Sequence, residues 1–357
     1  MIGLKEAGCS IEVYAFDRGV YPTNTNIEPV ILGKLKAGIF WNRLLTYCKA
    51  LPKYLELTRS EVPVYIFGFD NLVIFNMVSW LTRRRPLIIY EVADIHSFQT
   101  KNNPFGSIIK GFDSWLMKRV RLSVLTSREF YLSYFKTVLG LKLLNFQVIE
   151  NKVSTPGLGV VKSFGLAKHI NGSNDKITIG YFGLLRCRRS LEILIDGAEK
   201  QYWNLVLRGV FLNGTLDFIE KIQNLEHVSY YGAYVSPIDL EIMYSEIDIS
   251  WIAYPYSKES IGNWLWAKTN RYYESAYYKT PMIASVGTQD GNLVQVKSIG
   301  LTVDLADLIG SVNKIAEISK SQIDLWGTNI EALDTRDFVI TDEYLLLSKR
   351  IKELISH

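Results

Sequence analysis

Three arginines within four residues are the clearest candidates for binding chemistry in this chain. Arg186, Arg188 and Arg189 follow an apolar run that contains Gly183, and a helical pattern begins at Ser190. The N–H groups at the start of a helix carry partial positive charge. Guanidinium groups add charge-assisted hydrogen bonds to phosphate oxygens. The pattern therefore predicts a site for a phosphate-bearing ligand, and the alternative is a surface turn with solvated arginines.

A second candidate is the carboxylate of Glu274. It ends the polar and aromatic segment Asn270–Glu274, which includes Arg271, and Pro281 then starts the apolar run Met282–Ser285. A helix that stops shortly before a proline is a common local arrangement. On these residues alone, Glu274 is either a ligand-binding carboxylate or a solvated one.

Asp94 and His96 are the acid–base candidates of the first half. They follow an apolar run that ends near Tyr90. Histidine changes charge close to neutral pH, and carboxylates and histidines are the usual general acids and bases. The alternative is that His96 is a loop histidine without a catalytic role.

Composition and charge limit the class of protein. The chain has 357 residues, 48% of them hydrophobic, which suits a globular protein of two domains. Three scattered cysteines and four histidines have no metal-ligand spacing, so we expect a reducing compartment, no metal and no cofactor.

The first half of the chain is basic. Residues 1–155 carry 20 Lys and Arg against 12 Asp and Glu, and residues 83–136 carry ten against four. A basic first half favours an anionic acceptor or membrane surface; a solvated basic face is the alternative.

No segment is expected to act as a secretory signal or to span a membrane. Met1 is followed by Lys5 and Glu6 rather than an apolar stretch, and polar residues such as Asp70 interrupt the most apolar window, 62–81. A cytoplasmic protein is expected, with peripheral association at the inner face of the membrane. The apolar residues of 105–120 recur at helical spacing beside basic ones, which fits a membrane-surface helix or a helix packed on a sheet.

Apolar runs of strand length alternate with helical patterns along the chain. Such runs, rich in β-branched and aromatic residues, are typical of parallel sheets covered by helices. In the first half the expected strands are Ile11–Phe16, Val64–Phe69, Leu87–Tyr90, Leu122–Thr126 and Phe146–Ile149. In the second half they are Ile177–Phe182, Leu205–Gly209, Val228–Tyr231, Ile247–Ile252, Met282–Ser285 and Leu301–Val303. The predicted fold class is α/β, with two Rossmann-like parallel-sheet domains joined by the glycine-rich segment 152–176.

The second half resembles the donor domain of GT-B-fold, family-4-like retaining glycosyltransferases. Asn270–Ser285 resembles that family's Asn-Lys/Arg-aromatic-aromatic-Glu segment and the Pro-Val-Ile-Ala-Ser strand after it. The loop 183–189 resembles its Gly…Arg…Lys loop, and 228–249 resembles the strand, helix and strand between them. The first half resembles the family more weakly, at 90–96, 124–127 and 148–151.

The resemblance implies a fold and a set of roles. A GT-B fold has two domains facing a cleft: here an acceptor domain (1–155), a donor domain (156–335) and a C-terminal helix (336–357) that crosses back to the first. Gly183, Arg186, Arg188 and Arg189 would hold the diphosphate of a UDP- or GDP-sugar. Glu274, Asn270 and Arg271 would hold its ribose and sugar. The acceptor would be a saccharide, in particular a lipid-linked one used to build surface polysaccharide, and no nucleic acid is expected.

Three departures from the family pattern keep other functions open. The family's usual histidine is Ala93, with His96 three residues on, and Trp266 stands where a partner carboxylate of Glu274 is usual. Residues 1–8 look like a helix end, so either the start lies upstream or the first domain lacks its first strand. A degenerate binding module without activity fits these departures, and a nucleotide-sugar 2-epimerase fits them less well.

Overall fold

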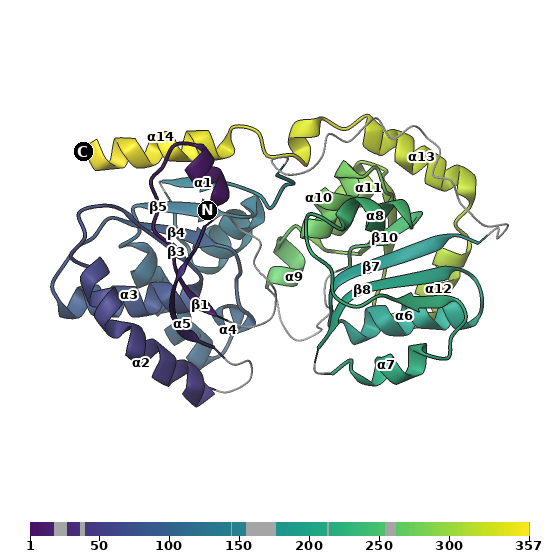
Figure 1. The fold of residues 1–357 in the computed structure, drawn as a ribbon, viewed down its shortest axis with the longest axis horizontal. Helices are drawn as coiled ribbons and strands as arrows, with labels where there is room; N and C mark the ends of the chain where they lie inside the picture. Colours follow the sequence, from purple (N-terminus) through teal and green to yellow (C-terminus); the bar gives the residue numbers. More distant parts are fainter. Residues whose placement is uncertain are drawn as a thin grey trace. The chain divides into compact units, whose positions relative to one another are not determined.

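Two compact α/β units make up the part of the chain described by the computed structural model (Figure 1). The described residues are 1–17, 27–35, 40–143, 145–154, 176–212, 214–253 and 262–356. Unit 1 is Met1–Glu150 with Thr341–His357, and unit 2 is Asn151–Ile340. The expected linker, 152–176, falls largely outside the described residues.

The main sheet of unit 1 has four parallel strands, and each lies within or overlaps an apolar run identified in the sequence. The strands stand in the order in which they occur along the chain: β3 (Val64–Phe67), β4 (Ile88–Val92), β5 (Leu122–Leu125) and β6 (Phe146–Val148). All four residues of β5 are buried. Strands buried on both faces read as continuous apolar runs, which is why the sequence identified them.

Helices cover both faces of this sheet. On one face, Leu4 and Leu347 pack with Ile89 and Val124, which places the first and last helices, α1 (Ile2–Glu6) and α14 (Glu343–Ser356), side by side above the strands in Figure 1. The helices below the strands in that view are α2 (Phe40–Leu57), α3 (Phe69–Leu81) and α5 (Pro104–Met117). A short helix, α4 (Ser97–Thr100), and a π-helix, η1 (Phe130–Val138), complete the unit.

One strand expected in this sheet lies elsewhere. The run Ile11–Phe16 contributes to β1 (Tyr14–Asp17), which pairs in parallel with β2 (Val30–Lys34) in a separate two-stranded sheet. The expected strand is present, but it lies outside the four-stranded sheet. The sequence did not reveal β2, because Val30 and Ile31 are 55% and 51% exposed and form no buried run.

Unit 2 contains a doubly wound parallel sheet of six strands. Its order is β12-β11-β10-β7-β8-β9, with all adjacent pairs parallel. The strands are β7 (Thr178–Leu185), β8 (Asn204–Phe211), β9 (Val228–Tyr230), β10 (Ile249–Trp251), β11 (Met282–Ser285) and β12 (Gly300–Val303). The strand order reverses between β7 and β10, so the chain runs outward from the middle of the sheet in both directions.

The helices of unit 2 surround an apolar core that includes the fully buried Trp203 and Trp251, and most of them bury apolar residues in this cluster or in a neighbouring one. They are α6 (Arg188–Glu199), α7 (Asp217–Ile222), α8 (Leu240–Ser245), α9 (Asn263–Trp266), α10 (Asn270–Tyr277), α11 (Gln289–Val296), α12 (Leu308–Ala316) and α13 (Lys320–Glu331), with a 3₁₀ turn at Thr335–Asp337. Across the described parts of both units, no helix is both long and apolar enough to cross a bilayer.

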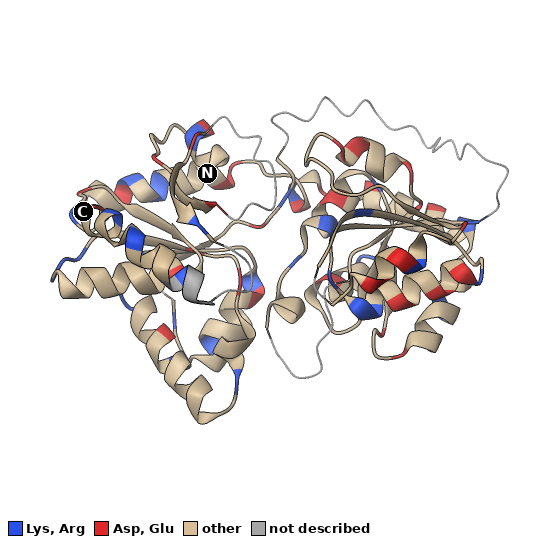
Figure 2. Ribbon diagram, turned by 60° about the horizontal axis from the view of Figure 1, so that its bottom comes forward, with Lys and Arg blue, Asp and Glu red and all other residues tan. Residues whose placement is uncertain are grey.

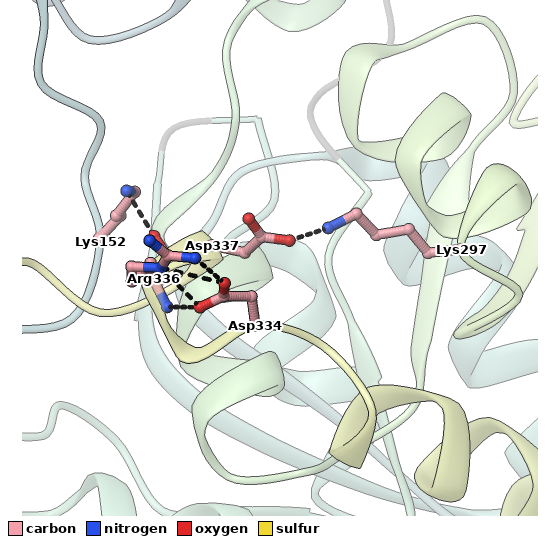
Figure 3. Close-up of polar contacts among 5 residues, drawn as sticks. All are labelled: Lys152, Lys297, Asp334, Arg336 and Asp337. Atoms are coloured by element: carbon pink, nitrogen blue, oxygen red, sulfur yellow. Dashed lines mark hydrogen bonds and ion pairs between the residues drawn. The ribbon is translucent and has the colours of Figure 1, made fainter.

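The two segments that connect the units are paired with each other inside unit 2. The Val153 N–H donates to the Phe338 carbonyl at 2.8 Å, and the Ile340 N–H donates to the Val153 carbonyl at 2.9 Å. Polar contacts surround this pairing in Figure 3: Lys152 Nζ donates to the Arg336 carbonyl at 2.6 Å, and Lys297 pairs with Asp337 at 2.5 Å. The chain passes between the two units after Glu150 and after Ile340.

Gly209 offers a direct test of the packing of β7 against β8. Its φ is +134°, and a Cβ built there would lie 1.8 Å from the Gly183 carbonyl oxygen. We expect Gly209→Ala to lower the free energy of unfolding by about 3 kcal/mol, since it combines a backbone clash with an unfavourable φ. Gly214→Ala is the matched control, because Gly214 has φ +97° and open space around it. Equal losses in urea unfolding of the two variants would contradict this account.

Candidate functional site

The reversal of strand order in unit 2 creates the place where its candidate residues meet. In open α/β sheets, ligands bind beyond the carboxyl ends of the strands where the order reverses. Here those strands are β7 and β10, which pair directly. Gly183 lies near the carboxyl end of β7, and α10, which carries Glu274, lies in the connection that follows β10. The fold therefore places two of the sequence-predicted segments at this edge.

Gly183, Gly209 and Gly232 leave part of the carboxyl end of the sheet, beside the strand reversal, without side chains. We call this part the glycine edge. Gly183 on β7 pairs in register with Gly209 on β8, and the Gly209 N–H donates to the Gly232 carbonyl at 2.6 Å, just beyond β9. Each has a positive φ, of +103°, +134° and +74° respectively. A Cβ at Gly183 would meet only the Tyr234 hydroxyl, at 3.8 Å. This edge can accept a close ligand, and sequence analysis missed the part played by Gly209.

Glu274 belongs to a hydrogen-bonded group around α10. The Tyr244 hydroxyl donates to Glu274 Oε2 at 3.0 Å. Burial raises the pKa of Glu274, and the Tyr244 hydroxyl and the Arg271 charge partly offset that rise. Tyr244 itself stacks on Tyr278, with ring centroids 5.0 Å apart. Glu274 is thus held in one orientation by neutral and cationic neighbours, as a carboxylate that binds hydroxyl groups would be.

Arg271 joins α10 to the end of β7. Its Nη1 donates to the Phe182 carbonyl at 3.3 Å, and its guanidinium lies over the Tyr181 ring, 5.2 Å from the centroid. Phe182 directly precedes Gly183, so Arg271 and Glu274 lie next to the glycine edge. Thr269 caps α10 by accepting from the Tyr272 N–H. Asn270, the first residue of the helix, is exposed.

Sequence analysis missed a buried carboxylate beside this group. Asp290, in the first turn of α11, is 3% exposed and accepts from the Thr269 N–H at 3.1 Å. Burial raises its pKa to about 7, although Thr269, Arg271 and Lys268 oppose the rise. An acidic residue in a first helical turn is a common capping signal, so nothing in the local pattern indicates that this one is buried.

The three predicted arginines do not behave alike. Arg188 forms a two-pronged pair with Asp217 at 2.9 and 2.6 Å, donates to the Gly214 carbonyl, and lies over the Phe218 ring. Arg189 pairs with Glu192 at 3.2 Å within α6. Arg186 precedes the helix and its side chain is exposed. The structure thus ties Arg188 to α7, a partnership that sequence analysis did not anticipate.

The candidates in unit 1 follow β4. Asp94 and His96 are both exposed, and the His96 ring stacks on Phe98 with ring centroids 5.2 Å apart. The Gln99 side chain accepts from the His96 backbone N–H at 2.8 Å. Sequence reasoning had no signal for this contact.

A buried carboxylate anchors that loop. Gln99 Nε2 donates to Asp113 Oδ2 at 2.9 Å, and the Tyr134 hydroxyl donates to the same oxygen. Burial raises the pKa of Asp113, and these two hydrogen bonds oppose the rise. The network joins α4, α5 and η1, and fixes the backbone that carries His96.

The two parallel-sheet units confirm the predicted α/β fold class with two Rossmann-like domains, the arrangement found in the GT-B fold. No protein-family model matches the chain. It is 28% identical, over 313 residues, to the succinoglycan biosynthesis protein ExoL of Rhizobium meliloti (strain 1021), covering 85% of this chain and 77% of ExoL.

Solved structures share the fold at low sequence identity. Anabaena HepE in complex with UDP-glucose matches with a TM-score of 0.59 and 16% identity, over 92% of this chain and 86% of HepE. The sucrose-phosphate synthase of Thermosynechococcus elongatus matches with a TM-score of 0.65 and 13% identity, over 97% of this chain and 88% of that protein.

Asp290 should make the stability of the protein depend on pH. Because its folded-state pKa is raised to about 7 from 3.8, the stabilisation from binding its proton is complete below about pH 4 and is lost as pH rises to about 7. At about 1.4 kcal/mol per pKa unit, the loss is roughly 4 kcal/mol. We expect Asp290→Asn to flatten the fall in melting temperature over this range, while keeping an acceptor for the Thr269 N–H. Asp324→Asn, at an exposed carboxylate of α13, is the control; an unchanged slope in Asp290→Asn would refute the assignment.

Proposed function

We propose that the protein is a glycosyltransferase that moves a sugar from a nucleotide-diphosphate sugar to a saccharide acceptor. The observation that carries the proposal is the arrangement at the strand reversal of unit 2. There a glycine edge free of side chains adjoins the group of Glu274 and Arg271, within a GT-B fold. HepE, which shares the fold, binds UDP and UDP-glucose, which supports a UDP-sugar as the donor.

Each candidate residue of the two units has a role in the proposal. The glycine edge and the first N–H groups of α6 bind the donor diphosphate, with Arg186, Arg188 and Arg189 as its cationic partners. Glu274 accepts from the ribose hydroxyls, with Asn270 and Arg271 beside it. Asp94 and His96 of unit 1 are assigned to the transferred sugar and the acceptor.

The chemistry asks for charge stabilisation more than for covalent catalysis. As the bond to the donor sugar breaks, negative charge develops on the departing diphosphate, and fixed N–H and guanidinium donors stabilise it. We propose transfer with retention of configuration and without a required metal. ExoL is a succinoglycan biosynthesis protein, which supports a saccharide acceptor in polysaccharide assembly. We propose that this acceptor is lipid-linked and is used at the cytoplasmic face of a membrane.

Glu274→Gln tests the donor site. The amide keeps the shape and an acceptor for the Tyr244 hydroxyl but loses the charge, so we expect UDP affinity to fall about tenfold, the scale of a hydrogen bond to a charged group. The melting temperature should stay equal or rise, since a buried charge is removed. Calorimetric titration with UDP measures the first, and Glu241→Gln, at an exposed position of α8, is the control. Intact affinity with a lowered melting temperature would show that Glu274 is structural.

The pair Arg188–Asp217 separates a phosphate-binding arginine from a structural one. If Arg188 leaves Asp217 to hold the diphosphate, Arg188→Ala should weaken UDP binding about tenfold. Asp217→Asn should then leave UDP affinity unchanged or raise it, because a competing anion is removed. If the pair only ties α6 to α7, both variants should shift the melting temperature alike and bind UDP as the parent does. That second result would remove Arg188 from the site.

A non-catalytic binding module with the same fold is the rival function. It predicts UDP or UDP-sugar binding that depends on Glu274, but no turnover. Release of UDP from UDP-glucose and other UDP-sugars, with and without a lipid-linked saccharide extract, distinguishes the two. UDP binding without release under any of these conditions would favour the binding module.

A further inference from the structure

Two neighbouring helices of unit 1, α3 and α5, expose large apolar side chains. On α3 these are Met77, Trp80 and Leu81, which are 51%, 63% and 70% exposed. On α5 they are Phe105, Ile108 and Trp115, which are 60%, 70% and 37% exposed. In both helices other apolar residues, such as Phe75 and Leu116, are buried. Each helix thus packs one side and leaves a second apolar side in solvent.

Helices α3 and α5 contact each other, so their exposed apolar sides are neighbours. Arg119, just after α5, donates from its Nε to Asn76 Oδ1 of α3 at 3.0 Å, and its guanidinium lies over the Trp115 ring at 5.5 Å. The Arg119 side chain therefore contacts Trp115 on α5 and, on α3, the residue that precedes Met77. We call the six exposed apolar residues of the previous paragraph the α3/α5 face. Contiguous exposed apolar patches of this kind mark interaction sites.

The charge around the α3/α5 face is mostly positive, with Asp70, in the first turn of α3, as an exposed carboxylate. Arg83–Arg85 follow α3 directly, Lys118 follows α5, and all four are exposed. The carboxylate of α5, Asp113, is buried and bonded to Tyr134 and Gln99, so it offers no negative charge at the surface. Figure 2 shows Lys and Arg spread over unit 1, whereas Asp and Glu gather more on the helices of unit 2.

We infer that the α3/α5 face docks on an anionic lipid surface, with its aromatic and aliphatic side chains entering the region between headgroups and acyl chains. Exposed Trp, Phe, Leu and Ile flanked by Lys and Arg are what such an interface binds. A second copy of the chain fits poorly, because a two-fold contact would bring the same positive charges together. Burial of apolar side chains is not screened by salt, so the binding differs from that of a basic surface alone.

Matched isoleucines test the docking face. Ile108 of α5 and Ile309 of α12 are both exposed helix residues, at 70% and 68%, so Glu at either is expected to leave folding intact, checked by melting temperature. With vesicles of phosphatidylcholine and phosphatidylglycerol in equal parts, we expect Ile108→Glu to partition at least about tenfold less than the parent. Ile309→Glu should match the parent. Equal partitioning of the two variants would overturn the inference.

Two further measurements separate insertion from its rivals. At about 1 M salt, where the Debye length is about 3 Å, a clear fraction of the parent should stay on the vesicles, and lipids brominated in the acyl chains should quench its fluorescence more than that of Trp80→Phe. Complete release by salt, or equal quenching, would reduce the face to a solvated basic surface. A dimer without vesicles that Ile108→Glu dissociates would assign the face to a second copy and also overturn the inference.

The inference does not depend on the proposed transferase activity. Ile108→Glu should bind UDP as the parent does, since it lies in unit 1 and outside the proposed donor site. Loss of vesicle binding with intact UDP binding therefore tests the docking face alone, and loss of UDP binding in Glu274→Gln with intact vesicle binding tests the donor site alone.

Discussion

The reversal of strand order between β7 and β10 is the constraint on which the candidate site depends. Because the chain leaves these two adjacent strands toward opposite edges of the sheet, their carboxyl ends are not covered by one common connection. The carbonyl of Phe182 is left to accept from Arg271. A shift of one residue in the register of β7 against β8 would place Phe182 or Leu184 opposite Gly209 in place of Gly183. A side chain would then occupy this edge. Register and topology together therefore make the edge available, before any functional side chain is considered.

Sequence reasoning succeeded where burial is continuous. The inner strands β4, β5, β10 and β11 are buried almost throughout, and their apolar runs are visible without knowledge of the fold. Glu274 and Gly183 could be named for a similar reason, since each stands beside such a run: Gly183 near the end of β7, and Glu274 shortly before Pro281 and β11. Where burial is partial the signal failed, as in β2, whose exposed Val30 and Ile31 pair only with β1.

Contacts between distant residues could not be predicted from one sequence. Arg188 and Asp217 are 29 residues apart and meet because α6 and α7 do; nothing in the local pattern of either helix indicates the other. The same holds for Asp113 and Tyr134, or Asp290 and Thr269. A carboxylate in a helix is usually solvated, so composition assigns these residues to the surface, and only the packing of a second element makes them buried.

Three carboxylates in the two units, one buried and two half-buried, are held in related ways but differ in their places in the fold. Glu91 accepts from the Tyr65 hydroxyl at 2.7 Å, Asp113 from Tyr134, and Glu274 from Tyr244. A neutral hydroxyl satisfies an oxygen without neutralising its charge, and burial raises the pKa of all three carboxyl groups. Arg271 opposes that rise at Glu274, and the N-terminal ammonium group opposes it at Glu91, so a nearby cation does not by itself distinguish these two carboxyl groups. A nearby cation favours the ionised form, which is the form that accepts from two ligand hydroxyls at once. What separates them is their place in the fold: Glu91 lies within β4 and Asp113 within α5, whereas Glu274 lies on α10, in the connection that follows β10 at the strand reversal.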